Sequence, residues 1–274
     1  MMKRHSFHFF VCLALGALVA LGACSKQPVE PPVDGQQHLL DLLNAEDKLY
    51  RDQQLASQAM GRKMKYTVWL PCGYDSSKEY PFLYLLHGYG DDNNSWADKG
   101  GAQQIAKDYV SKGGTPMVIV MPDGLVNFYS GAWEDYFHQE LIPEVERAYH
   151  CNGKRAVAGL SMGGMETMEV VFRNPDMFRY AWVLSSSLQP GTDPAAEAER
   201  LNLAAKVEKI NKNYKAFVFT QGGPSDIAYQ NCINTRDALR KLGLKFDYME
   251  NAQAGHSWTT WRADLMTFAP TLFR

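Results

Sequence analysis

Short apolar runs alternate along the chain with longer segments in which apolar positions recur every three to four residues. The runs have the length of buried strands, whereas the spaced pattern is typical of amphipathic helices. The expected strands are residues 65–70, 82–86, 117–121, 156–159, 181–184, 216–220 and 245–249. The expected helices are residues 102–111, 136–149, 162–172, 195–210, 227–242 and 257–268. This alternation predicts an α/β fold with a mostly parallel sheet and helices on both faces.

The first residues follow a different pattern. Lys3 and Arg4 precede an apolar or small-residue run over 9–23, which is too short for a transmembrane helix but suits a signal peptide. The run ends Leu21-Gly22-Ala23-Cys24, which resembles a bacterial lipobox and would make Cys24 the lipidated N-terminus. A plain secretory leader with an incidental Cys24 is the alternative reading.

Residues 24–38 contain three prolines and a glycine, a composition that favours neither a helix nor a paired strand. We therefore expect a signal peptide over 1–23, a lipidated tether over 24–38 and a folded catalytic domain over 39–274. On this interpretation the protein is exported and anchored to a membrane through lipid, in the periplasm or at the cell surface.

Composition narrows the function classes. The chain is 46% hydrophobic and 21% charged with a formal net charge of -2, so it is globular and lacks the basic excess of a nucleic-acid partner. Beyond the leader and Cys24, the cysteines are Cys72, Cys151 and Cys232. They allow at most one disulfide and contain no C-x-x-C motif, and buried free thiols are the preferred interpretation. We expect a monomer that uses no metal and no cofactor.

Residues 159–163 (G-L-S-M-G) fit the nucleophile motif G-x-S-x-G. An apolar run precedes the motif and a helical pattern follows it, which is the strand–turn–helix context that the motif requires. A sharp turn lifts the serine hydroxyl above the sheet and directs the helix N-terminus toward a developing oxyanion. Ser161 is therefore the candidate nucleophile.

A second loop, His87-Gly88-Tyr89-Gly90, directly follows the apolar run at 82–86. An H-G-x-G loop at this place supplies a backbone N–H to an oxyanion in hydrolases that carry such an elbow. The expected oxyanion donors are the amides of Tyr89 and Met162. We expect His87 to brace this loop rather than to act as a base, because it precedes the nucleophile in the chain.

His256 is the only histidine after Ser161, and it lies between the last predicted strand and the last predicted helix. It is therefore the candidate base. Asp226, in the Gly/Pro-rich loop after 216–220, is the candidate acid, although it could instead cap the helix that follows. Asp193 and Asp247 are weaker candidates, because one lies in a Pro/Gly-rich loop and the other within a strand.

These segments resemble an esterase family of the α/β-hydrolase fold, over roughly residues 51–273. That family includes esterase D, S-formylglutathione hydrolases, mycolyltransferases of the antigen 85 type, and feruloyl and acetylxylan esterases. The resemblance rests on residues 63–71, 87–96, 140–143, 159–164 and 255–265. It implies the α/β-hydrolase fold, a triad of Ser161, Asp226 and His256, and the amides of Tyr89 and Met162 as oxyanion donors.

Within that family, a compact exported lipoprotein is most similar to the feruloyl esterases, which release hydroxycinnamates from plant cell-wall polysaccharides. The resemblance implies a small ester or an esterified polysaccharide as substrate. Trp133 and Tyr129 could form an aromatic wall for a phenolic acyl group, or they could pack in the core. The rival functions are acetyl esterase, siderophore esterase or acyltransferase on the same triad, and a glycan-binding lipoprotein without catalysis.

Overall fold

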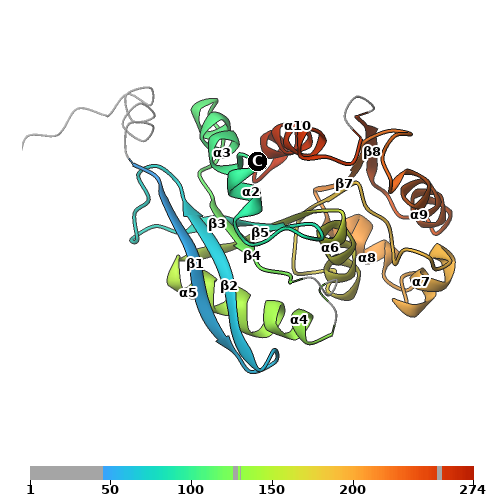
Figure 1. The fold of residues 1–274 in the computed structure, drawn as a ribbon, viewed down its shortest axis with the longest axis horizontal. Helices are drawn as coiled ribbons and strands as arrows, with labels where there is room; N and C mark the ends of the chain where they lie inside the picture. Colours follow the sequence, from blue (N-terminus) through green and yellow to red (C-terminus); the bar gives the residue numbers. More distant parts are fainter. Residues whose placement is uncertain (1–45, 126–128, 130, 252–254) are drawn as a thin grey trace, which may run out of the picture. The chain divides into compact units, whose positions relative to one another are not determined.

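The computed structural model describes residues 46–125, 129, 131–251 and 255–274. Within them, one eight-stranded sheet has the order β1-β2-β4-β3-β5-β6-β7-β8 (Figure 1). β1 pairs with β2, and β2 with β4, in antiparallel fashion; all other pairs are parallel. The strands are β1 (Lys48–Ser57), β2 (Arg62–Leu70), β3 (Tyr80–Leu86), β4 (Val118–Pro122), β5 (Cys151–Leu160), β6 (Tyr180–Leu184), β7 (Ala216–Gln221) and β8 (Asp247–Glu250). The predicted mostly parallel sheet is confirmed.

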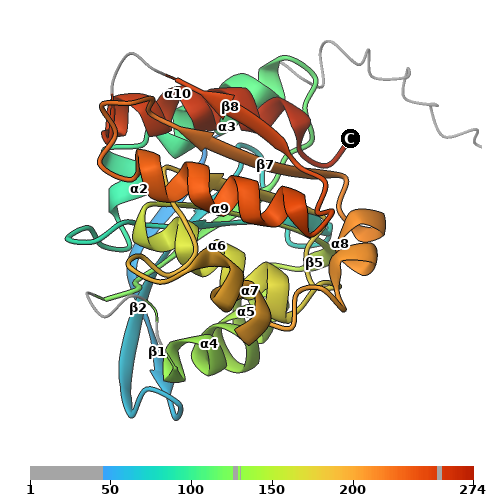
Figure 2. The same cartoon turned by 90° about the vertical axis from the view of Figure 1, so that its right-hand side faces the viewer.

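Helices cover both faces of the sheet (Figures 1 and 2). One face carries α2 (Ser95–Asp98), α3 (Ala102–Ser111), α10 (Trp258–Phe268) and the 3-10 turn η2 (Ala269–Thr271). The other carries α4 (Ala132–Asp135), the π-helical turn η1 (Tyr136–Leu141), α5 (Ile142–Ala148), α6 (Met162–Arg173), α7 (Pro194–Arg200), α8 (Val207–Asn213) and α9 (Tyr229–Lys241). This is the α/β-hydrolase arrangement that the sequence predicts.

The central strands are buried on both faces, which explains their continuous apolar sequences. In β3 the side chains of Phe82 and Tyr84 enter one core cluster, and those of Leu83 and Leu85 enter the other. Successive side chains of a strand point to opposite faces, so both faces must be apolar when both carry helices.

One observed strand was not predicted, and two predicted helices differ from the observed ones. β1 was not predicted, because most of its positions are exposed and polar, as suits a strand at the edge of the sheet. The helix expected over 195–210 is two helices, α7 and α8, and Asn202 between them has a left-handed φ of 49°. The helix expected over 136–149 begins earlier, at Ala132, and passes through the π-helical turn.

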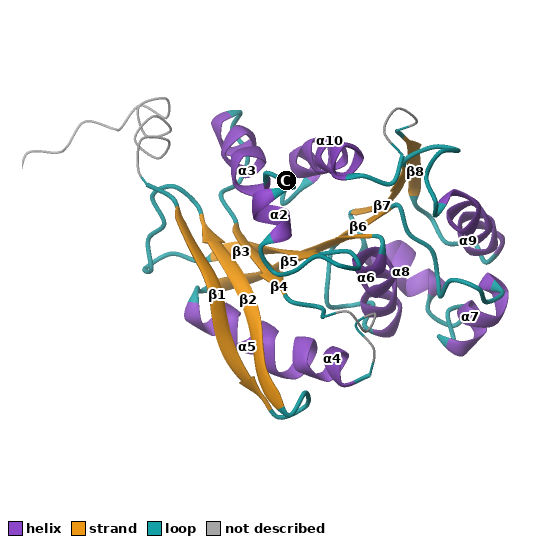
Figure 3. Cartoon of the chain, in the orientation of Figure 1, coloured by secondary structure: helices purple, strands orange, loops and turns teal. Residues whose placement is uncertain are grey.

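The signal peptide, the tether and Cys24 lie outside the described residues. Within the described part of the chain, no helix combines the length and the apolar content needed to cross a bilayer. The parallel strands β5, β6 and β7 end side by side at Leu160, Leu184 and Gln221 (Figure 3). Loops that follow these strands therefore meet at one edge of the sheet, where ligands bind in folds of this kind.

Candidate active site

Ser161 occupies the turn between β5 and α6, in a strained backbone conformation with φ 51° and ψ −118°. The two glycines of the motif are required by close packing. A Cβ atom at Gly159 would lie 2.1 Å from the carbonyl oxygen of Gly163, and one at Gly163 would lie 2.4 Å from that of Leu86. The sequence motif thus folds as a sharp elbow that only glycine permits at these positions.

His256 bridges Ser161 and Asp226. Its Nε2 lies 3.0 Å from the Oγ of Ser161, and its Nδ1 lies 2.7 Å from Oδ1 of Asp226. A carboxylate can only accept, so Nδ1–H donates to Asp226 and leaves Nε2 as the acceptor for the serine hydroxyl. Three loops at one edge of the sheet thus bring together the three residues selected from the sequence.

The Asp226 side chain has no solvent exposure. Burial raises its pKa, but hydrogen bonds, the one from His256 foremost, hold the pKa at about 2. Oδ1 also accepts from the backbone N–H of Ala228 at 2.8 Å, and Oδ2 accepts from that of Gly222 at 3.1 Å. Asp226 therefore organises the turn before α9 while it faces the imidazole. The N-cap of α9 is Ala228, so the capping role weighed from the sequence is not observed.

The other two acidic candidates lie elsewhere in the fold. Asp193 caps α7, with its carboxylate accepting from the backbone N–H of Ala195 at 3.1 Å. Asp247 begins β8 and is exposed. Neither forms the imidazole contact that Asp226 makes.

The H-G-Y-G loop passes directly beside the nucleophile. A Cβ atom at Gly88 would lie 3.4 Å from Cβ of Ser161, so the backbone approaches closely enough to serve an oxyanion. Met162 is the first residue of α6, where backbone N–H groups point out of the helix N-terminus. Tyr89 lies in this loop and is 65% exposed.

His87 braces the loop, as expected. It is buried, its Nδ1 lies 2.8 Å from the carbonyl oxygen of Gly88, and its Nε2 accepts from the backbone N–H of Gly124 at 2.8 Å. Nδ1 must therefore carry the proton and donate to Gly88. The ring thereby joins the loop after β3 to the loop after β4.

Trp133 and Tyr129 do not form the aromatic wall considered from the sequence. Both are fully buried, and their rings meet edge to face with centroids 4.5 Å apart. The Tyr129 hydroxyl donates to the carbonyl of His87 at 2.8 Å, and the Trp133 indole N–H donates to that of Asp123 at 2.9 Å. These side chains support the loops beneath the site, because their polar atoms are needed for buried carbonyl groups.

Two residues of α10 near the site were not selected from the sequence. The ring of Trp261 meets that of His256 edge to face, at 5.0 Å between centroids and 88° between planes. Asp264, one turn further on, is buried. The sequence could have pointed to Asp264, because this carboxyl group interrupts the apolar stripe formed by Trp261, Leu265 and Phe268.

The described residues contain no group of three or more His, Cys, Asp or Glu side chains arranged to hold a metal ion. The three cysteines are free thiols; Cys232 is buried, and Cys72 and Cys151 are half-buried. Burial raises the pKa of the Cys232 thiol to about 12, so it is not a nucleophile at neutral pH.

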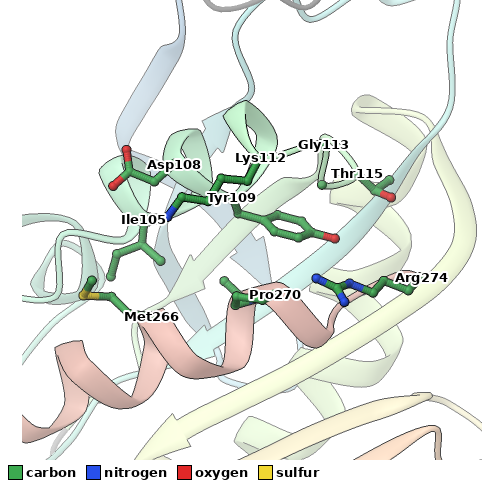
Figure 4. Close-up of a pocket in the computed structure, with 11 residues that line it drawn as sticks. Ile105, Asp108, Tyr109, Lys112, Gly113, Thr115, Met266, Pro270 and Arg274 are labelled. Atoms are coloured by element: carbon green, nitrogen blue, oxygen red, sulfur yellow. The ribbon is translucent and has the colours of Figure 1, made fainter.

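A cavity of about 480 Å³ lies between α3 and the C-terminal segment (Figure 4). It is lined by Tyr109, Lys112, Met266, Pro270 and Arg274 among others, and none of the residues of the Ser161 site lines it. The Tyr109 hydroxyl donates to the carbonyl of Leu272 at 2.6 Å. This cavity lies where α3 and α10 end, so it is separate from the Ser161 site.

Comparisons with known proteins agree with this geometry. Residues 57–272 match the family model described as "Putative esterase". The chain is 31% identical over 237 residues to an "Endo-1,4-beta-xylanase/feruloyl esterase" of Xylanibacter ruminicola, covering 80% of this chain and 30% of the relative. It is 29% identical over 210 residues to "Endo-1,4-beta-xylanase Y" of Acetivibrio thermocellus, covering 69% of this chain and 19% of the relative. The chain thus spans less than a third of the length of either relative.

Among solved structures, a ferulic acid esterase superposes with a TM-score of 0.72 at 26% sequence identity. The match covers 83% of this chain and 97% of that one. This superposition and the family match over most of the chain together show the family to which the chain belongs. The chain is a member of this esterase family and has the α/β-hydrolase fold.

Proposed function

We propose that this esterase hydrolyses hydroxycinnamoyl esters, such as feruloyl groups on plant cell-wall polysaccharides, with Ser161, His256 and Asp226 as its catalytic triad. The hydrogen-bonded chain from Ser161 through His256 to buried Asp226 is the observation that carries the reaction type. The substrate class is supported by relatives named as feruloyl esterases at moderate identity.

In the first half-reaction, Nε2 of His256 takes the Ser161 hydroxyl proton while Oγ bonds to the ester carbonyl carbon. The amides of Tyr89 and Met162 donate to the oxygen as it gains negative charge. The intermediate then collapses, the bond to the alcohol oxygen breaks, and that oxygen takes the proton from Nε2. An acyl group remains on Ser161.

In the second half-reaction, water gives a proton to Nε2 and its oxygen attacks the acyl carbon. Collapse of this intermediate breaks the bond to Oγ, which recovers the proton, and the carboxylic acid leaves. Asp226 stays ionised throughout, because its pKa of about 2 lies far below neutral pH. Its charge stabilises the imidazolium that forms in each step.

The test is hydrolysis of methyl ferulate against 4-nitrophenyl acetate by the full chain in detergent. Ser161→Ala is expected to lower turnover of both esters by roughly four to six orders of magnitude. Ser111→Ala, at an exposed serine of α3, is the matched control and should keep full activity. Turnover of the acetate alone would support a serine esterase but contradict the feruloyl substrate, and would favour an acetyl ester instead. No turnover of either ester by folded protein would contradict the catalytic proposal.

We also propose that the enzyme is exported and held at a membrane, as a monomer, by lipid on Cys24. The support is the apolar run over 9–23 that ends in Leu21-Gly22-Ala23-Cys24, followed by the Pro-rich segment. Cells fed an alkyne-tagged fatty acid should label the wild-type protein and not Cys24→Ala, with Cys72→Ala as the matched control. Equal labelling of wild type and Cys24→Ala would contradict the anchor.

A further inference from the structure

Helix α10 buries a carboxyl group that the mechanism above does not use. Asp264 is 6% exposed and shares the buried face of the helix with Thr260, Trp261, Leu265 and Phe268. An ionised carboxylate on such a face is costly unless donors compensate for the lost water. Asp264 therefore requires a physical explanation.

The donor to Asp264 belongs to a pair of side chains on the two strands beneath the helix. The indole N–H of Trp182 on β6 donates to Oγ1 of Thr220 on β7 at 3.0 Å, and Oγ1 lies 2.8 Å from Oδ2 of Asp264. An indole N–H can only donate, so the hydroxyl proton of Thr220 is directed at Asp264. The Thr220 hydroxyl thus donates to the carboxyl group and favours its ionised form, and the Trp182 indole fixes the direction of that hydroxyl.

The same helix is tied to both loops that carry the His256–Asp226 pair. Thr260, one turn before Asp264, donates to the carbonyl of Gly255 at 2.7 Å, immediately before His256. Asp264 is bonded to Thr220, and two residues after Thr220 the backbone of Gly222 donates to Asp226. Helix α10 therefore holds the loop of His256 through Thr260 and the loop of Asp226 through Asp264.

Among the residues that the structure describes, few charged groups act on Asp264. Trp182 and Thr220, which face it from β6 and β7, are neutral, and the charged group that acts on it from the loop after β7 is Asp226. Asp226 is in turn hydrogen-bonded to His256. A negative charge on Asp264 would therefore add to the field that Asp226 exerts on the imidazole.

We propose that Asp264 is a positioning residue of the triad, which aligns the His256 and Asp226 loops through Thr220 and, when ionised, makes His256 a stronger base. The proposal rests on the triad acting as described above. Burial raises the pKa of Asp264 to about 6, the Thr220 hydrogen bond opposes that rise, and the charge of Asp226 adds to it. The carboxyl group consequently gains its charge in the pH range in which a histidine base begins to work.

The test is the pH dependence of kcat/KM for 4-nitrophenyl acetate in wild type and Asp264→Asn, which keeps the shape and removes the charge. The acidic limb of the Asn variant should move to lower pH by roughly half a unit, and its kcat at pH 8 should fall a few-fold while KM is unchanged. Asp237→Asn removes an exposed carboxylate of α9, 59% exposed, and should shift nothing.

A second measurement does not depend on turnover. The imidazole of His256 is titrated by NMR in isotopically labelled protein, with His256→Gln to assign its signal. Asp264→Asn should lower the midpoint by the same half unit, and Thr220→Val should lower it by less, because the carboxyl group remains but loses its donor. Superimposable profiles and equal midpoints in wild type and Asp264→Asn would overturn the proposal. Loss of ester turnover in the wild type would instead count against the proposed function and leave the titration to decide on Asp264.

Discussion

The loop after β7 and helix α10 each bury a carboxyl group, Asp226 in the loop and Asp264 in the helix. Asp226 accepts hydrogen bonds from His256 and from two backbone N–H groups, and its pKa is about 2. Asp264 accepts one from the neutral hydroxyl of Thr220, and its pKa is about 6. Burial acts in the same direction on both. The donors that each region supplies therefore decide whether a buried carboxyl group is permanently charged or titrates near neutrality.

The largest expected effect on turnover comes from removing the charge of Asp226 in the loop after β7. Asp226→Asn replaces an acceptor with an amide, so the imidazole loses the partner that sets its tautomer and stabilises its cation. We expect kcat to fall by on the order of 10³- to 10⁴-fold. The matched variant Asp264→Asn should lose only a few-fold. Equal losses in steady-state turnover would show that the two carboxyl groups are not distinguished as described.

A smaller effect concerns stability against pH. The folded-state pKa of Asp226 lies below its ordinary value of 3.8, so its stabilising contribution is present above pH 4 and is lost as pH falls toward 2. The shift corresponds to about 2 kcal/mol of unfolding free energy. The pKa of Asp264 lies above 3.8, so the folded state holds the extra proton and stability declines as pH rises from about 4 to 6.

Denaturant unfolding of the two Asn variants at pH 4 and pH 7 separates these opposite contributions. Asp264→Asn should be more stable than wild type at pH 7, by up to about 3 kcal/mol, and should gain less at pH 4. Asp226→Asn should be less stable than wild type at pH 7. A pH-independent difference in unfolding free energy for both variants would refute the contrast.

The smallest effect is expected from the aromatic neighbour of the base. Trp261→Phe keeps an aromatic ring against His256 but removes part of the edge-to-face contact. We expect a loss of roughly two- to five-fold in kcat, with the pH profile unchanged, because no charge is altered. A shifted pH profile in this variant would assign to Trp261 the effect that we attribute to Asp264.

The site divides into parts that the sequence predicts and parts that it does not. The elbow at Ser161 could be identified because the strand, the two glycines and the helix are consecutive in the chain. His256 could be selected because it is the only histidine after Ser161, and Asp226 could be selected because it lies in a loop directly after a strand. Local sequence was sufficient for these residues, since each loop is positioned by the strand immediately before it.

The roles of Trp133, Tyr129 and Asp264 could not be obtained in that way. In the sequence, two aromatic residues between a strand and the next predicted helix suit a substrate wall and a buried support equally well. Only the tertiary structure shows that their polar atoms bond to the backbone beneath the site. The link from Asp264 to Thr220 spans two elements 44 residues apart, and spacing along the chain does not encode it.

The central claim, that Ser161 forms the acyl-enzyme with His256 as its base, can be tested by trapping that intermediate. The protein is mixed with methyl ferulate, quenched in acid within milliseconds and digested, and the peptide that contains residue 161 is analysed by mass spectrometry. The account predicts a feruloyl adduct on Ser161 in the wild type and none in Ser161→Ala or His256→Gln. An adduct on another residue, or ferulate release in Ser161→Ala at the wild-type rate, would contradict it.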